Sequence, residues 1–325
     1  MAKKSSVHVD HVTNEISKTS RDDLSSLIQE TLNKANKDGG KVAYFLDQQE
    51  DPSQISDWIS TGSTLLDLAI SNRPNGGLPV GRIVELNSLE GIGKSLMCAH
   101  ICAETQKKGG VAIYLDTESA ASPDFWKSLG VDIKNLVYVR PFTIEEVFEY
   151  VEGIIAKVRA SNKDRLVTIV VDSIAGATTE KESTSEHGVD GYNTTKALVI
   201  GKAMRRITNT ISKQRILLVL TNQLRQNMNA MAFGDKWICP GGKGVPFAAS
   251  VRIRLASLGK LKRGDDVIGT KCKATVIKNR MGPPHRVAEF EIHFDSGIQD
   301  RKSWLDFLKK HKLATSGGGK YTIKL

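Results

Sequence analysis

The chain has 325 residues, of which 40% are hydrophobic and 25% are charged. This composition is ordinary for a globular protein, and the length fits one large domain or two modest ones with a sizeable core. No apolar run reaches about 18 residues, so the sequence predicts no membrane span, and the N-terminal residues lack the apolar segment of a secretory signal. The cysteines form no CxxC pair, which favours a reducing compartment; they are Cys98, Cys102, Cys239 and Cys272.

The formal net charge of +10 is placed unevenly along the chain. Residues 1–250 carry 29 Lys and Arg against 29 Asp and Glu, whereas residues 251–325 carry 17 against 7. The whole excess therefore lies in the last 75 residues. A one-sided basic region suggests a polyanionic partner, and the alternative is that the charge serves solubility alone.

The polar N-terminal segment contains one amphipathic pattern. Four apolar residues at helical spacing predict a helix over 21–36, and a Gly pair after Asp38 ends it; the four are Leu24, Leu27, Ile28 and Leu32. This helix is either a packed part of the main domain or an arm that docks elsewhere, for example on another subunit.

From about residue 60 apolar runs alternate with amphipathic helices. Strands are predicted over 82–86, 111–115, 136–139, 166–171 and 216–221, and helices over 94–108, 143–159 and 193–213. Such alternation predicts an α/β fold with a mainly parallel central sheet flanked by helices. After residue 245 strands follow one another without helices, over 250–256, 271–278 and 288–294, which predicts an antiparallel extension of the sheet.

The sharpest motif is SLEGIGKS at residues 88–95, which follows a predicted strand and opens a predicted helix. Its glycines let the backbone wrap an anion, and amides at the helix start donate to phosphate oxygens. Lys94 would reach the β- and γ-phosphates of ATP, and the Ser95 hydroxyl would bind Mg²⁺. Ser88 stands where the strict pattern has glycine, and the alternative is a chance glycine turn. The residues predicted to contact the nucleotide here are Glu90, Gly91, Ile92, Gly93, Lys94, Ser95 and Leu96.

A second element agrees with a nucleotide site. Residues 166–172 form an apolar run that ends in Asp172, which is how the metal-side carboxylate of such ATPases is presented. Asp172 would hold Mg²⁺ through water. The alternative is a buried strand that ends in a capping aspartate.

Several segments in order carry a resemblance to a known family. They are ISTGS (59–63), GGLPVGRIVE (76–85), YLDTE (114–118), LGVD (129–132), VVDS (170–173), LTNQLR (220–225), PGG (240–242) and VIKNR (276–280). Over 59–298 the chain resembles the bacterial RecA-type recombinases. The resemblance implies a RecA-like P-loop ATPase core at 59–298, a small N-terminal helical arm for oligomerisation at 1–58, and a short basic C-terminal region at 299–325.

The resemblance also implies roles at the ATP site. Glu118 matches the carboxylate that activates the attacking water; its neighbour Asp116 is the rival, and a surface glutamate is the bland alternative. Gln223 matches the residue that senses the γ-phosphate and relays its state to a DNA loop. Phe125 stands where the family has an aromatic that stacks on adenine, although it can equally be a core residue beside Trp126.

Two cations match residues that the family inserts into the neighbouring subunit's ATP site. They are Lys278 and Arg280, and Arg280 replaces the lysine typical of bacterial members. A cation supplied in trans stabilises charge on the transferring phosphoryl group, so hydrolysis would require a filament.

The family's two DNA loops correspond to residues 183–192 and 224–242. The residues implied in DNA binding are His187, Gly188, Tyr192, Arg225, Asn227, Met228, Met231, Phe233, Lys236, Gly241, Gly242 and Lys243. Lys243 stands where the family usually has Asn, and Tyr192 where Met is common. Cations here would meet phosphates, and apolar residues would stack on bases or wedge between them.

The resemblance therefore implies a DNA-dependent ATPase that uses ATP and Mg²⁺. It would form a helical filament on single-stranded DNA, pair that strand with homologous duplex DNA and exchange strands, in the cytoplasm of a bacterium or of a phage-infected cell. The alternatives are a related ATPase with another role, such as a ring helicase or a signalling ATPase, and a non-catalytic protein that coats single strands. The basic C-terminal region is predicted to capture incoming duplex DNA through Lys302, Lys309, Lys310, Lys312, Lys320 and Lys324.

Overall fold

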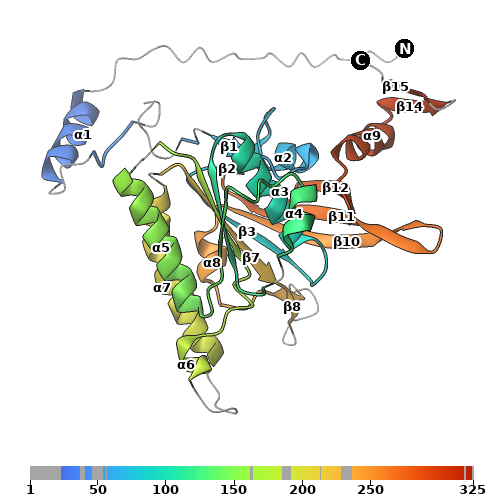
Figure 1. Cartoon of the computed structure of the whole chain (residues 1–325). Coiled ribbons are helices and arrows are strands. Elements are labelled where there is room, and N and C mark those ends of the chain that lie inside the picture. The colour runs from blue at the N-terminus through green and yellow to red at the C-terminus, as the bar shows by residue number, and fades with distance from the viewer. Residues whose placement is uncertain are drawn as a thin grey trace, which may run out of the picture. The chain divides into compact units, whose positions relative to one another are not determined.

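The computed structural model describes residues 23–36, 41–45, 54–55, 57–119, 121–161, 164–184, 192–212, 214–227, 236–317 and 320–323. Its contacts group the chain into two compact units, Met1–Gln54 and Ile55–Leu325. Figure 1 labels the helices and strands of both units.

The first unit contains the predicted N-terminal helix, α1 (Asp23–Ala35). Asn33 fixes the chain after the helix, because its Oδ1 accepts the backbone N–H groups of Val42 and Ala43 at 2.8 Å each. The apolar stripe of α1 is exposed by 51–60% at each of Leu24, Leu27, Ile28 and Leu32. Within the described residues this amphipathic helix therefore leaves its apolar face largely uncovered.

The second unit is built around one nine-stranded sheet with the order β13-β12-β11-β10-β3-β7-β6-β4-β5. The pairings from β10 to β5 are parallel, and those from β10 to β13 are antiparallel. This confirms the α/β class and the antiparallel extension. The strands are β3 (Ile83–Ser88), β4 (Val111–Asp116), β5 (Leu136–Val139), β6 (Val167–Asp172), β7 (Ile216–Gln223), β10 (Val251–Arg263), β11 (Asp266–Asn279), β12 (Val287–His293) and β13 (Gly297–Ile298).

Helices cover both faces of the sheet (Figure 1). Helices α2 (Thr64–Ser71), α3 (Lys94–Lys107) and α4 (Pro123–Ser128) contribute to one buried cluster. Helices α5 (Ile144–Ser161), α7 (Tyr192–Ile211) and α8 (Gly244–Ala248) contribute to the other. The central strands β3, β6 and β7 are buried along nearly their whole length, which is why their sequences read as continuous apolar runs.

Short elements complete the second unit. Three two-stranded sheets pair β1 (Trp58–Ile59) with β2 (Leu78–Pro79), β8 (Arg225–Gln226) with β9 (Trp237–Ile238), and β14 (Ala314–Gly317) with β15 (Lys320–Ile323). In the part of the chain that the structure describes, the remaining helices are α6 (Glu180–Ser183) and α9 (Asp300–Lys310). The predicted strands 250–256 and 271–278 were too short, because β10 and β11 form one long hairpin that turns between Arg263 and Asp266 and projects beyond the helices (Figure 1). The predicted strand 288–294 matches β12 within one residue.

Candidate nucleotide and DNA site

The phosphate loop joins β3 to α3, as the sequence predicts. Gly91 and Gly93 have positive φ values of 70° and 108°, a conformation that side chains disfavour. A Cβ at Gly93 would lie 2.8 Å from Ile292 Cδ1, whereas no heavy atom lies within 4 Å of a Cβ at Gly91. The loop is therefore tight against the sheet at one glycine and open at the other. This backbone suits an anion approaching the helix N-terminus.

Lys94 begins α3 and turns back toward the end of β3. Its Nζ donates to Ser88 Oγ at 3.1 Å and to the Leu89 carbonyl at 3.3 Å. Burial lowers the pKa of the Lys94 ammonium, while the Asp172 and Glu118 carboxylates act in the opposite direction. Ser88 is the last residue of β3 and does not have a positive φ, so its backbone conformation does not require glycine. The Ser88 hydroxyl accepts the hydrogen bond from Lys94.

Asp172 ends β6 in a buried position. Its Oδ2 accepts the Tyr114 hydroxyl and its Oδ1 accepts the Thr221 hydroxyl, each at 2.5 Å. The two donors come from β4 and β7, the strands on either side of β6. They orient the carboxylate, and neither contact is evident from the sequence because the two donors lie 58 and 49 residues away in the chain.

Glu118 and Gln223 meet although 105 residues separate them. Gln223 Nε2 donates to Glu118 Oε1 at 3.2 Å, and Ser173 Oγ donates to the same oxygen at 2.5 Å. Ser173 follows Asp172, and the peptide bond between them is cis. Ser173 is a third residue that was not identified from the sequence, although it lies inside the VVDS segment.

Asp116, the rival to Glu118, is 3% exposed and fully engaged. It accepts the backbone N–H groups of Glu118, Ser119 and Ala121 at 2.7–3.1 Å and the hydroxyl of Tyr138 at 2.8 Å. Asp116 thus holds the turn that presents Glu118. This arrangement favours Glu118 over Asp116 as the group that faces a nucleotide.

The oxygen donors at this site suit Mg²⁺. Ser95 is exposed on the first turn of α3, and the Asp172 carboxylate is oriented by its two hydroxyl donors. In the described residues no group of three His, Cys, Asp or Glu side chains is arranged to hold a metal. Mg²⁺ commonly takes only one or two protein ligands and completes its shell with water and phosphate oxygens, so a hydroxyl and a carboxylate are sufficient.

The other residues predicted to contact the nucleotide differ in how far they are buried. Glu90 is exposed, Ile92 is partly buried, and the Leu96 side chain lies in the core, which leaves its backbone for the loop. Phe125 lies on α4, partly buried against the core cluster that contains Trp126. Its stacking on adenine stays a prediction.

Lys278 and Arg280 are not at the phosphate loop of their own chain. Lys278 lies opposite Arg252 on β10, about 10 Å along that strand from Leu255, the residue level with Ser88. Lys278 Nζ donates to the carbonyls of Pro246 and Phe247 at 2.7 and 3.0 Å, and Arg280 donates to the Phe247 carbonyl at 3.1 Å. Burial and the neighbouring Arg280 and Arg252 lower the pKa of Lys278 to about 8.

The base of the second predicted DNA loop is ordered by β8 and β9. Arg225 pairs with Ile238, and the Asn227 N–H donates to the Lys236 carbonyl at 2.8 Å. Arg225 and Lys236 are exposed beside this ladder. The predicted residues His187, Gly188, Met228, Met231 and Phe233 lie outside the described residues, and Tyr192 is described only as the first residue of α7.

The Gly241–Gly242 turn packs against α7. Both glycines have positive φ, and a Cβ at Gly241 would lie 2.6 Å from Ile200 Cδ1, while one at Gly242 would lie 2.9 Å from Ala197 Cβ. Only glycine fits a backbone that approaches a helix this closely. The turn therefore forms one closely packed surface with α7.

Next to this turn, a hollow of about 610 Å³ lies between α7 and α8. Three cations line it, and none of its described lining residues is acidic: Gly201, Met204, Arg205, Thr208, Asn209, Lys243, Gly244, Phe247, Ala248 and Arg280. Arg205 was not identified from the sequence, because only the fold brings α7 beside residue 243. A cationic hollow of this kind suits an anionic ligand.

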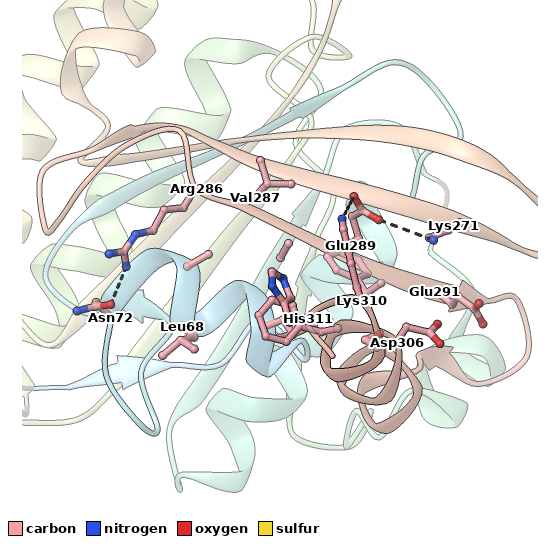
Figure 2. Close-up of a pocket in the computed structure, with 16 residues that line it drawn as sticks. Leu68, Asn72, Lys271, Arg286, Val287, Glu289, Glu291, Asp306, Lys310 and His311 are labelled. Carbon is pink, nitrogen blue, oxygen red and sulfur yellow. Dashed lines mark hydrogen bonds and ion pairs between the residues drawn. The ribbon is translucent and has the colours of Figure 1, made fainter. Parts of the chain in front are cut away.

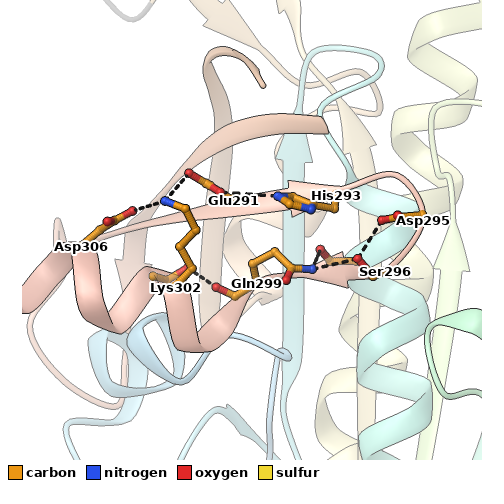
Figure 3. Close-up of polar contacts among 9 residues, drawn as sticks. Glu291, His293, Asp295, Ser296, Gln299, Lys302 and Asp306 are labelled. Carbon is orange, nitrogen blue, oxygen red and sulfur yellow. Dashed lines mark hydrogen bonds and ion pairs between the residues drawn. The ribbon is translucent and has the colours of Figure 1, made fainter. Parts of the chain in front are cut away.

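The basic C-terminal region is partly neutralised within the chain. Lys302 Nζ lies 2.9 Å from both Glu291 and Asp306, in a network that continues to His293 (Figure 3). Lys310 lies 3.4 Å from Glu289 at the edge of a pocket of about 530 Å³ lined by α2, β12 and α9 (Figure 2). Two of the lysines assigned to duplex DNA are thus paired with carboxylates.

Comparison with known proteins agrees with this geometry. The family model for the RecA N-terminal domain matches residues 26–299. The chain belongs to the RecA family. The match begins within α1, so the family relationship extends N-terminally beyond the 59–298 segment assigned from the sequence. The expected RecA-like fold is thereby confirmed, and membership of the RecA family implies nucleotide binding and DNA binding.

Individual RecA relatives cover most of the chain. It is 36% identical to Protein RecA of Clostridium acetobutylicum over 291 residues, which are 90% of this chain and 80% of that protein. It is 34% identical to Protein RecA of Heliobacterium modesticaldum over 297 residues, 91% and 83% of the two chains. Protein RecA of Nitratiruptor sp. is 35% identical over 285 residues, 88% and 79% of the two chains. Within the described residues, none of the helices is long and apolar enough to cross a membrane.

Proposed function

We propose that this chain is an ATP-dependent homologous recombination protein that forms a filament on single-stranded DNA and exchanges strands with a homologous duplex. Membership of the RecA family supports a recombinase function over the helicase and signalling alternatives. The observation that carries the proposal is the contact between Glu118 and Gln223, because it joins the ATP site to the segment that begins at Arg225. Because the two side chains are hydrogen-bonded, a change in the position of one would change the position of the other.

In the proposed ATPase, Glu118 accepts a proton from the attacking water while Ser173 and Gln223 hold its carboxylate. Lys94 leaves Ser88 and meets the β- and γ-phosphates. Ser95 and, through water, Asp172 would hold Mg²⁺, which would supply neutralisation of the phosphate charge. The intact set of Lys94, Glu118 and Asp172 favours hydrolysis over a non-catalytic coating role.

DNA binding is proposed on the face formed by α7, the Gly241–Gly242 turn and α8. The hollow there presents Arg205 and Lys243 without an acidic lining residue, which supports contact with a phosphate backbone. Arg225 and Lys236, which are exposed at the base of the second loop, would add further positive charge to this proposed DNA-binding surface. Contacts with the phosphate backbone do not distinguish one base sequence from another, so base pairing between the strands would supply the sequence specificity.

Filament formation is proposed to complete the ATP site. Lys278 and Arg280 stand away from the phosphate loop of their own chain, which supports their action on the nucleotide of a neighbouring subunit. Residues 1–58 would form the arm, with the apolar stripe of α1 covered by that neighbour. Residues 59–298 would form the ATPase and DNA-binding core, and 299–325 the short C-terminal region.

An ATP-dependent strand-exchange assay tests the proposal. The purified chain is mixed with circular single-stranded DNA, homologous linear duplex, ATP and Mg²⁺, and joint molecules are measured over time. We expect joint molecules with homologous duplex, none with heterologous duplex, and none from Lys94→Ala. Unwinding of duplex without pairing would support the helicase alternative, and strand coating without ATP turnover would support the non-catalytic one.

A further inference from the structure

Lys196 is a cation on the buried stripe of α7. It shares one helical face with Ile200, Ala203 and Ile207, which are buried against the sheet. Its Nζ donates to the carbonyls of Ala177 and Ala175 at 2.5 and 3.1 Å. A charge at such a position is costly unless it is hydrogen-bonded, so these two carbonyls determine where Lys196 lies.

The two carbonyls flank Gly176, in the segment that follows Asp172. The Gly176 N–H donates to Ser173 Oγ at 3.0 Å, and Ser173 Oγ donates to Glu118 Oε1 at 2.5 Å. A Cβ at Gly176 would lie 2.9 Å from Glu118 Cγ, so this backbone lies directly against the glutamate. A displacement of residues 175–177 would therefore displace the Glu118 carboxylate.

The same turn of α7 also touches the candidate DNA face. Ala197, the next residue, lies against Gly242, and Ile200 lies against Gly241. Burial lowers the pKa of the Lys196 ammonium, Glu182 and Glu145 act in the opposite direction, and Arg225 adds to the lowering. Lys196 thus stands between the Gly241–Gly242 turn and the carboxylate proposed for hydrolysis.

We infer that Lys196 is a positioning residue that couples DNA binding at the Gly241–Gly242 turn to Glu118 through Ser173, by a route separate from Gln223. DNA bound at the turn would fix the position of α7. Lys196 would then fix residues 175–177 through its two hydrogen bonds. The inference rests on the proposed function, because it assumes ATP turnover that DNA stimulates.

The test compares Lys196→Met, which keeps the alkyl chain and removes the donor, with Lys196→Arg, which keeps donors for both carbonyls. Lys202→Met, an exposed lysine of the same helix, is the matched control. Basal and DNA-stimulated kcat, KM for ATP, Kd for single-stranded DNA and Tm are measured for each. We expect Lys196→Met to lower DNA-stimulated kcat about tenfold or more, because removal of Nζ loses two charge-assisted hydrogen bonds, with a smaller loss of basal kcat and with KM unchanged.

Lys196→Arg should recover most of the stimulated rate, and Lys202→Met should match the unmodified chain. Full stimulation in Lys196→Met would overturn the inference, as would equal loss of basal and stimulated turnover that Lys196→Arg does not rescue. An unmodified chain whose ATPase does not respond to DNA would instead reject the proposed function.

A second comparison separates the two routes and holds even where Lys196→Met folds poorly. Ser173→Ala removes the other end of the link, and we expect a comparable loss of stimulated kcat. When either change is combined with Gln223→Ala, the fold-losses should multiply if the routes are independent. A double variant no slower than Gln223→Ala alone would contradict a separate route.

Discussion

Asp116 and Glu118 stand two residues apart at the end of β4, and their surroundings separate their roles. Asp116 is buried and accepts three backbone N–H groups and a hydroxyl, so its lone pairs are used in holding the turn. Glu118 is fixed through one oxygen by Ser173 and Gln223. A base must have a lone pair available for the reacting water, and these two contacts engage only Oε1 of Glu118, which supports the proposal that Glu118 is the base.

Replacement of Glu118 tests this assignment. Glu118→Gln keeps an amide oxygen for Ser173 and Gln223 but removes the base, so we expect DNA-stimulated ATPase to fall by about 10² or more. Filaments viewed by electron microscopy should persist with ATP. Asp116→Asn is the companion variant and should lower Tm by weakening the turn. Unchanged turnover in Glu118→Gln would reject Glu118 as the base.

A second residue-scale prediction concerns Asp67 on α2. Burial raises the pKa of this carboxyl from 3.8 to about 6, although Ser60 and Thr61 donate to it. The folded state therefore binds the proton more tightly than the unfolded chain, so this contribution to stability is complete below pH 4 and is lost as pH rises to about 6. A shift of about two units corresponds to roughly 3 kcal/mol at most.

Asp67→Asn removes this titration. Urea unfolding of both chains between pH 4 and pH 8 should show the variant gaining stability relative to the unmodified chain up to about pH 6.5, with a constant difference above it. A difference that does not vary with pH would show that Asp67 does not titrate in this range.

At the scale of elements, the packing of α9 on β12 pairs part of the C-terminal positive charge with carboxylates. Lys302 and Lys310 are paired with Glu291, Asp306 and Glu289, which anchors the helix on β12 (Figures 2 and 3). Lys312 and Lys320 lie beyond the helix and are exposed. The proposed capture of duplex DNA by this end of the chain therefore depends more on the second pair than on the first.

Two double variants of equal charge test this proposal. Lys312→Gln with Lys320→Gln should weaken duplex DNA binding and lower its salt slope by about two, because each phosphate contact contributes about one. Lys302→Gln with Lys310→Gln should change the slope less. Single-strand binding is measured in parallel, and an equal loss for both DNA forms would contradict a duplex-specific role.

At the scale of the whole molecule, the proposed active site is divided between two subunits. Glu118 lies at the phosphate loop of one chain, whereas Lys278 is held at the end of α8, away from that loop. Subunits joined head to tail form an open helix when the rotation between them does not close a ring, so in the proposed filament every internal site would be completed by its neighbour.

Mixing two inactive variants tests the division. Lys278→Ala should abolish turnover while isolated protomers still bind nucleotide, and Glu118→Gln should also be inactive. In an equal mixture, about a quarter of the interfaces would combine an intact Glu118 with an intact Lys278, so ATPase should recover to about a quarter of the unmodified rate. No recovery in mixed filaments would argue that both residues act within one chain.

Residues of the site differ in how far the sequence could identify them. Lys94, Asp172, Glu118 and Gln223 lie inside local motifs whose order along the chain was recognisable. Lys196 and Arg205 lie outside these motifs, and their neighbours in sequence give no sign of their contacts. Tyr114, Thr221 and Ser173 form an intermediate group, since they lie inside motifs but their contacts with Asp172 or Glu118 span 58, 49 and 55 residues.

The sequence by itself determined the α/β class, the phosphate loop and the position of the N-terminal helix. The helix and strands follow from the local periodicity of apolar residues, and the phosphate loop follows from glycines at positions where the backbone must approach an anion. Only the tertiary structure shows that Asp116 holds the turn that presents Glu118, gathers the cations beside α8, and pairs Lys302 and Lys310 with carboxylates. Those outcomes depend on which strands and helices become neighbours, and adjacency in a sheet is set by packing of both faces rather than by local composition.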